Sequence, residues 1–238
     1  MESTLHHQLK QRFGSEGGGR SEVEVLVAGF RVDAVDTEGR LVEVQSGALG
    51  PLREKLVRLL PEHRMRVIKP VVIDRKVIRR ARPEGPDLSA RRSPKRGQAL
   101  DVFDDLVGLA SVFPHPNLLV DVLAVTIDEI RTPRRRRPGY TVADRQLRSV
   151  LSSTSLCDAY DLWNLIPPGL ASPFTSLELA DHLGRSMDFA QRVAYCLRLS
   201  GAAAQVGKRG NRLVYVDKRT SVQAGWTSKT TLRAVARL

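Results

Sequence analysis

Cysteine is scarce in this sequence, and long apolar segments are absent. The two cysteines, Cys157 and Cys196, lie far apart and fit neither a zinc-binding nor a disulfide pattern. No apolar run reaches the roughly 18 residues that a membrane span needs, and residues 1–10 lack the apolar segment of a signal peptide. We therefore expect a cytoplasmic protein, associated with the nucleoid if its source is bacterial.

Acidic residues are outnumbered, and the imbalance is uneven along the chain. Lys and Arg number 38 against 26 Asp and Glu, a formal charge of +12. Residues 131–238 contain 18 Lys and Arg against 7 Asp and Glu, a net charge of +11. Lys and Arg bind polyanions by neutralising phosphates, so a nucleic acid is the expected partner of this part of the chain. A solvated basic surface without a ligand is the alternative.

The first third of the chain has the apolar periodicity of a helix, three strands, a second helix and a further strand. Leu5, Leu9 and Phe13 recur at every fourth position, which is typical of one helix face. Val-rich segments with alternating polarity follow, separated by glycine-containing turns. We expect strands at residues 23–27, 31–35, 41–45, 65–69 and 71–73, and a helix between Gly50 and Pro61.

A polar and basic extension follows at residues 74–140. We expect a Pro- and Gly-rich loop at 83–97, a helix at 101–113 and a strand at 118–127. Arg134–Arg137 lie between two prolines and have the composition of a charged connector. This indicates a first domain at 1–140, with its core at 1–72, and a domain boundary near residue 140.

The second domain, expected at residues 141–220, has a helical pattern and then a hairpin. Thr175 followed by Glu178 predicts a capping box, and Gly184 follows as a helix end. The expected helices lie at 155–166, 175–183 and 186–200, the hairpin at 203–216, and a basic tail with a short helix near Thr230 at 221–238.

Two acids and an amide on the expected strands carry the strongest chemical signal. Glu43 and Gln45 are two positions apart on one strand and share a face, and a tight turn can bring Asp33 beside Glu43. Neighbouring carboxylates repel unless a cation lies between them. Oxygen ligands of this kind suit Mg²⁺ or Mn²⁺, which can activate water for phosphodiester hydrolysis.

The order of segments together with Asp33 and Glu43-Val44-Gln45 resembles the PD-(D/E)XK nuclease superfamily, over residues 1–72. The resemblance implies an α/β (α+β) fold with a restriction-endonuclease-like αβββαβ core. It also implies that Asp33, Glu43 and the Val44 carbonyl bind the metal, and that Gln45 occupies the position of the motif lysine.

Glutamine at that position departs from the family pattern, because it cannot supply positive charge. Lys55 on the following helix is the nearest replacement; Lys69 and an extra acid at Glu2 are weaker candidates. His6 and His7 are expected on a helix surface. Alternating polar residues on an exposed sheet produce the same short pattern, and so does a degenerate nuclease fold kept for DNA binding.

The segments at 155–217 are similar to the winged-helix family, a helix-turn-helix followed by a basic hairpin. A recognition helix enters the major groove, where Gln and Arg suit base edges, and the hairpin contacts phosphates. A winged helix used for protein contacts is the alternative. The expected DNA-binding residues are Arg185, Ser186, Gln191, Arg192, Tyr195, Lys208, Arg209 and Arg212.

These patterns together predict a metal-dependent DNA endonuclease, docked on DNA by its C-terminal domain. Asp33, Glu43, Gln45 and Lys55 are the expected catalytic residues. A homodimer would allow two strands to be cut. The alternative is a DNA-binding or regulatory protein without catalysis.

Overall fold

The computed structural model describes residues 3–14 and 22–219. Over these residues the protein is α+β, with a mixed seven-stranded sheet and a separate three-stranded sheet. The helices are α1 Thr4–Gly14, α2 Arg53–Leu59, α3 Phe103–Leu106, α4 Ser176–Leu183 and α5 Met187–Ser200, with 3-10 turns η1 Gly50–Leu52, η2 Ala99–Val102, η3 Val107–Leu109 and η4 Tyr160–Leu165. The strands are β1 Glu22–Val27, β2 Phe30–Val35, β3 Leu41–Val44, β4 Met65–Arg80, β5 Asp87–Arg92, β6 Leu118–Pro133, β7 Tyr140–Leu156, β8 Phe174–Thr175, β9 Ala203–Arg209 and β10 Arg212–Asp217.

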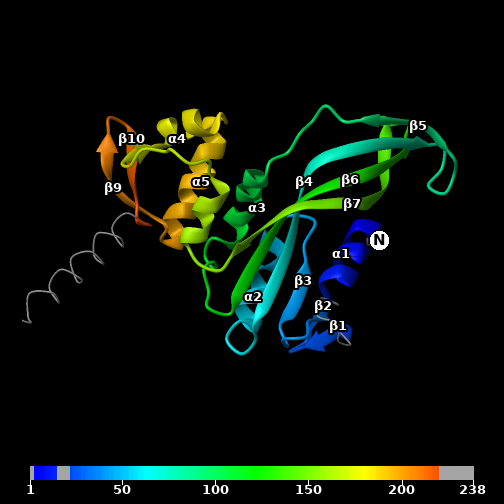
Figure 1. Ribbon diagram of the computed structural model, residues 1–238, viewed down its shortest axis with the longest axis horizontal. Helices are drawn as coiled ribbons and strands as arrows, with labels where there is room; N and C mark the ends of the chain where they lie inside the picture. Colours follow the sequence, from blue (N-terminus) through cyan, green and yellow to red (C-terminus); the bar gives the residue numbers. More distant parts are fainter. Residues whose placement is uncertain (1–2, 15–21, 220–238) are drawn as a thin grey trace, which may run out of the picture.

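The large sheet has the strand order β1-β2-β3-β4-β6-β7, with β5 paired to the distal part of β4 (Figure 1). Strands β1, β2 and β3 form an antiparallel meander, whereas β3, β4 and β6 run parallel. The predicted order of helix, three strands, helix and strand in the first third of the chain is therefore confirmed. None of the described helices is both long and apolar enough to cross a membrane.

Two helices cover opposite faces of the central strands. Leu5, Leu9 and Phe13 of α1 are almost fully buried in one cluster with Val42 and Val44. The α2 side chains Leu56 and Leu59 pack in the other cluster, which includes Leu41, Met65 and Val67. Alternate residues of β3 therefore pack against α1 on one face of the sheet and against α2 on the other. This packing holds in place the strands that carry Asp33 and Glu43.

Strands β4, β6 and β7 continue beyond this core as a long arm, which corrects four expectations (Figure 1). The loop expected at 83–97 contains β5. The expected strand at 118–127 extends to residue 133, and Arg134–Arg137 form the turn between β6 and β7. The helix expected at 101–113 is instead a series of short helical turns. Charged and polar residues predominate in the distal parts of these strands, so pairing with neighbouring strands contributes more there than a buried apolar face.

The domain boundary expected near residue 140 is wrong, because β7 pairs with β6 along its length up to Leu156. The first part of the segment expected to be a helix at 155–166 is the end of β7, and only Tyr160–Leu165 forms a 3-10 turn. A C-terminal unit, defined here as residues 157–219, follows the sheet. Figure 1 places this unit and the arm on opposite sides of α3.

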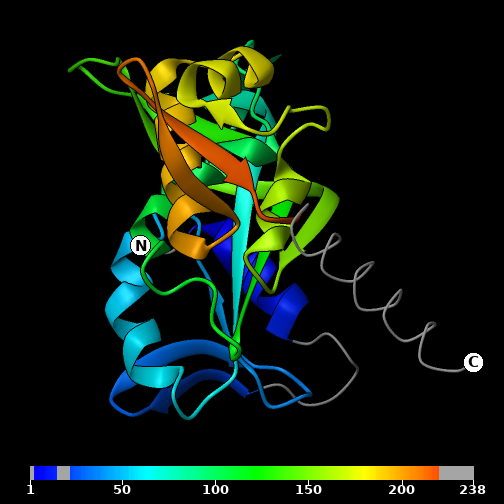
Figure 2. The same ribbon diagram turned by 90° about the vertical axis from the view of Figure 1, so that its left-hand side faces the viewer.

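The C-terminal unit contains the predicted pair of helices and hairpin. Thr175 caps α4 through the predicted capping box with Glu178, and Gly184 ends the helix at a φ of 59°. Strands β9 and β10 pair antiparallel, and β8 pairs with β10. Figure 2 shows the orange hairpin in front of α5. The basic tail and its expected helix near Thr230 lie outside the described residues.

Candidate functional site

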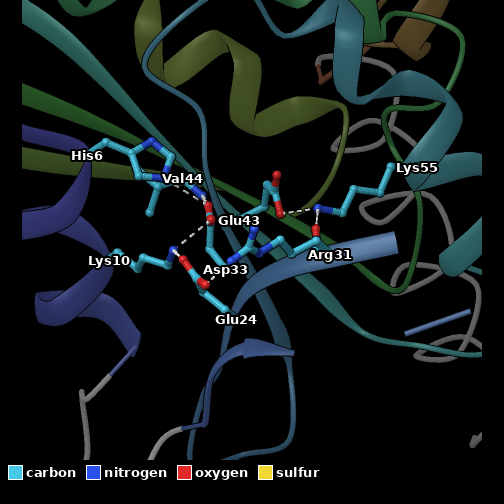
Figure 3. A network of polar contacts seen from close by, with 8 residues as sticks. All are labelled: His6, Lys10, Glu24, Arg31, Asp33, Glu43, Val44 and Lys55. Carbon is cyan, nitrogen blue, oxygen red and sulfur yellow. Dashed lines mark hydrogen bonds and ion pairs between the residues drawn. The ribbon is translucent and has the colours of Figure 1, made fainter. Parts of the chain in front are cut away.

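Asp33 and Glu43 lie side by side where the β2–β3 ladder ends. The last residue pair on this ladder is Ala34 opposite Val42, and the next residues along the two strands are Asp33 and Glu43. The Val44 N–H donates a hydrogen bond of 2.9 Å to Asp33 Oδ2 (Figure 3). The strand alternation therefore brings the predicted acids together, with only 17% and 12% of their side chains exposed.

The Asp33 carboxylate faces α1. His6 Nε2 lies 3.3 Å from Asp33 Oδ2, and Lys10 Nζ lies 3.4 Å from Asp33 Oδ1. Burial alone would raise the pKa of Asp33, but the hydrogen bonds from His6 and Val44 and the charge of Lys10 outweigh it, so the pKa is lowered. The carboxylate is held ionised at neutral pH.

The Glu43 carboxylate faces α2 instead. Lys55 Nζ lies 2.5 Å from Glu43 Oε2 and also donates to the Arg31 carbonyl (Figure 3). Burial raises the pKa of Glu43, and the neighbouring charge of Asp33 raises it further, against the opposing effect of Lys55. Lys55, the lysine expected nearest to the acids, therefore lies in direct contact with one of them.

Other residues expected at this site point elsewhere. The Gln45 amide donates to the Ala48 carbonyl at 2.7 Å, within its own loop. Lys69 donates to the Gly47 carbonyl and lies 2.8 Å from Asp105. Glu2 lies outside the described residues. Among the residues that the structure describes, no three His, Cys, Asp or Glu side chains gather as a ready-made metal site.

Two residues of α1 beside Asp33 were not foreseen in these roles. His6 was expected on the helix surface, but only 20% of its side chain is exposed; His7 is exposed as expected. Lys10 is 4% exposed and also lies 3.1 Å from Glu24. Their spacing of four residues puts them on one helix face, which is a weak signal unless the packing of α1 is known.

The residues expected to bind DNA in the C-terminal unit lie in four different places. Gln191, Tyr195 and Arg212 line a groove of about 640 Å³ between α5 and the hairpin, together with Arg198, Gln205 and Asn211, which the sequence did not single out. Arg185 and Arg192 pair with Asp101 and Asp104 near α3, the latter at 2.7 Å. Lys208 and Arg209 lie on the exposed hairpin, and Arg209 lies 2.7 Å from Glu178. The Ser186 hydroxyl caps α5.

The fold defines an α+β protein whose mixed sheet carries an acid pair and whose C-terminal unit packs against α3. The chain belongs to a family described as "Domain of unknown function (DUF8091)", whose model matches residues 3–157. It is 32% identical over 219 residues to an "Uncharacterized protein" of Treponema pallidum (strain Nichols). This alignment covers 90% of the present chain and 84% of that relative. No solved structure gives a significant match. The family match ends one residue after β7, so the family domain corresponds to the seven-stranded sheet and its helices.

Proposed function

We propose that this protein is a metal-dependent DNA endonuclease with a PD-(D/E)XK-like core. The observation that carries the proposal is the cluster of Asp33, Glu43 and Lys55 on β2, β3 and α2, within the α1-β1-β2-β3-α2-β4 order. This cluster supplies two adjacent carboxylates and an ammonium group from one buried site. The residue types match those that the resemblance assigns to metal binding and charge stabilisation.

The ligand atoms available at this site are of the kind that Mg²⁺ or Mn²⁺ prefers. Asp33, Glu43 and the Val44 carbonyl offer oxygen ligands, and Mg²⁺ commonly takes one or two carboxylates and completes its shell with water and substrate phosphate. When bound, such an ion supplies a water of lowered pKa and stabilises charge on a leaving oxygen. Lys55 holds Glu43 and would supply a positive charge to a phosphate bound with such an ion, while Lys10 and His6 hold Asp33 in its ionised form.

The C-terminal unit supports docking on DNA. Two helices joined at Gly184 and followed by a hairpin have the arrangement of a winged helix. The groove beside α5 presents Gln191, Tyr195 and Arg212, side chains suited to bases and phosphates. Arg185 and Arg192 contribute less in this arrangement, because both already pair with carboxylates near α3.

A second candidate function, DNA binding without cleavage, has its own support. Lys10 already neutralises Asp33, and the Gln45 amide is bonded to its own loop. A core that has lost catalysis while keeping its fold would have these features.

A cleavage assay on the full chain distinguishes the two functions. Supercoiled plasmid and branched DNA are incubated with Mg²⁺, Mn²⁺ or EDTA, and binding is measured separately in EDTA. We expect metal-dependent cutting by the native protein, with a loss of at least about 100-fold in Asp33→Ala and Glu43→Ala and no loss of binding. Glu38→Ala, which removes an exposed carboxylate from the same hairpin, is the matched control and should cut normally. Binding without cutting by all of these proteins would favour the second function.

A further inference from the structure

The positive charge of the protein is concentrated on one element of the fold. We define the basic arm as residues 74–96 and 128–148, the distal parts of β4, β6 and β7 together with β5 and the turns between them. These segments contain 16 Lys and Arg against 6 Asp and Glu, a net charge of +10. The C-terminal unit, by contrast, contains 8 Lys and Arg against 6 Asp and Glu, a net charge of only +2.

Much of the charge on the arm is not neutralised within the protein. Glu129, only 1% exposed, is the shared carboxylate of Arg75, Arg131 and Arg145. Within the described part of the chain, no carboxylate pairs with a further set of basic residues on the arm. These are Lys76, Arg79, Arg82, Arg91, Lys95 and Arg134–Arg137.

Like charges also lie directly opposite one another on the arm. Lys76 is paired with Arg92 across β4 and β5, and Arg79 with Arg131 across β4 and β6. Such pairs destabilise a sheet. Arg92 and Arg131 each also pair with a carboxylate, Asp74 and Glu129, so Lys76 and Arg79 are the cations of these ladders that an anion bridging the strands would neutralise.

We propose that the basic arm is the principal surface by which this protein binds double-stranded DNA. The seven residues Asp74–Arg80 span roughly 20 Å at about 3.3 Å per residue. Duplex DNA carries one negative charge per roughly 1.7 Å of axis, so a segment of that length presents about a dozen phosphates. The net charge of the arm is close to that number.

The shape of the arm favours DNA over RNA. A two-stranded antiparallel ribbon fits the major groove of B-form DNA, whereas the major groove of A-form RNA is too deep and narrow for it. Past the last β4–β6 pair, Arg79 opposite Arg131, only β6 and β7 remain paired, so the tip of their hairpin is such a ribbon. Its turn presents the four exposed arginines Arg134–Arg137. Arg79, Arg131 and Tyr140 line a hollow beside this end of the hairpin.

The inference rests on the proposed function only in taking DNA as the ligand, and it does not require cleavage. Binding is therefore measured in EDTA, by fluorescence anisotropy with a labelled 30-base-pair duplex, at NaCl concentrations from 50 to 300 mM. The full chain is compared with a variant in which Arg134, Arg135, Arg136 and Arg137 are all replaced by Ala. The matched control replaces four exposed arginines away from the arm, Arg12, Arg53, Arg58 and Arg64, by Ala.

We expect the arm variant to bind at least tenfold more weakly near 150 mM salt. Its log–log salt slope should be shallower by about 3 to 4, because each lost phosphate contact removes about 0.9. The control should stay within about twofold of the native protein. Circular dichroism and thermal unfolding check that both variants are folded.

Three results would overturn the inference: equal losses in the two variants, no loss in the arm variant, or tighter binding of duplex RNA than of duplex DNA by the native protein. Absence of any DNA binding by the native protein would instead refute the DNA partner itself, and with it the proposed function. Binding that depends on the arm, without metal-dependent cutting, would support the inference and favour the non-catalytic function.

Discussion

Glu129 offers a sharp test of the electrostatics of the arm. Its carboxylate is 1% exposed and contacts the guanidinium groups of Arg75, Arg131 and Arg145, at 3.1, 2.5 and 3.4 Å. Replacing it by Gln keeps the size of the side chain but removes the negative charge that these three arginines share. The variant Glu129→Gln should therefore be destabilised both by a lost ion pair and by repulsion among the three cations.

The exposure of the three arginines determines how much stability Glu129→Gln should lose. Breaking a fully buried ion pair costs about 3–5 kcal/mol. Here the arginine side chains are 24%, 18% and 46% exposed, so solvent screens part of the repulsion. We expect a loss of about 2–3 kcal/mol in the free energy of unfolding at pH 7, or roughly 5–10 °C in Tm for a chain of this size.

The pH dependence gives an independent check. Burial would raise the pKa of Glu129, but the hydrogen bond from Arg131 and the charges of Arg75 and Arg145 outweigh it and lower the pKa below its ordinary value of 4.5. A lowered pKa contributes stability at pH values above the ordinary one, and this contribution is lost as the pH falls through the lowered value. The native protein and Glu129→Gln should therefore converge in stability as the pH falls from 4.5 through the lowered pKa of Glu129.

Urea unfolding across this pH range measures the difference, and Asp128→Asn is the matched control. Asp128 is the preceding residue of β6, is 23% exposed and contacts only Arg148, at 3.5 Å, among the ion pairs of the described residues. Its replacement should cost at most about 1 kcal/mol. If Glu129→Gln loses no more stability than Asp128→Asn at pH 7, the three-arginine cluster does not depend on this carboxylate and the reasoning is refuted.

Two further predictions concern the core. Asp33→Asn should lower the free energy of unfolding by about 1–3 kcal/mol at pH 7. Because the pKa of Asp33 is lowered in the folded protein, this loss of stability should decrease as the pH drops below the ordinary aspartate value of 3.8. A loss unchanged at pH 3 would contradict this account. Gly108→Ala should lower the free energy of unfolding, measured with urea, by about 1–3 kcal/mol, because a Cβ there would lie 2.6 Å from the Gly50 Cα. Gly207→Ala is the control and should be close to neutral, because a Cβ there would have nothing within 4 Å. Equal effects at the two glycines would exclude a steric cause.

Local signals in the sequence were sufficient for much of the fold. The capping box at Thr175, the end of α4 at Gly184 and the apolar repeat from Leu5 to Phe13 each fix an element through contacts within a few residues. The proximity of Asp33 and Glu43 followed from the same kind of reasoning, because strand period and a tight turn determine which residues become neighbours.

The arm could not be predicted in this way. Of residues 140–156 only Leu156 is buried, so the strand character of this segment comes from pairing with β6 rather than from a buried face. Separate strands were expected at 65–69 and 71–73, yet β4 is continuous through Pro70, which lies opposite Leu123 of β6. Likewise, Lys10 reaches Asp33 only because α1 packs on the sheet, a tertiary contact without a local signal.

The position of the basic residues in the fold differs from their position along the sequence. Residues 131–238 do contain most of the excess charge, but Arg131–Arg148 belongs to the arm and not to the C-terminal unit. Once these residues are assigned to the β6–β7 hairpin, they join Arg75–Arg96 from the other half of the chain on one element. The acidic turn that contains Asp101 and Asp104 lies between the arm and the C-terminal unit and pairs with Arg185 and Arg192. Long-range steering of a polyanion depends on uncompensated charge rather than on the number of basic residues, so the arm, and not the helix pair, should make the first contact with DNA.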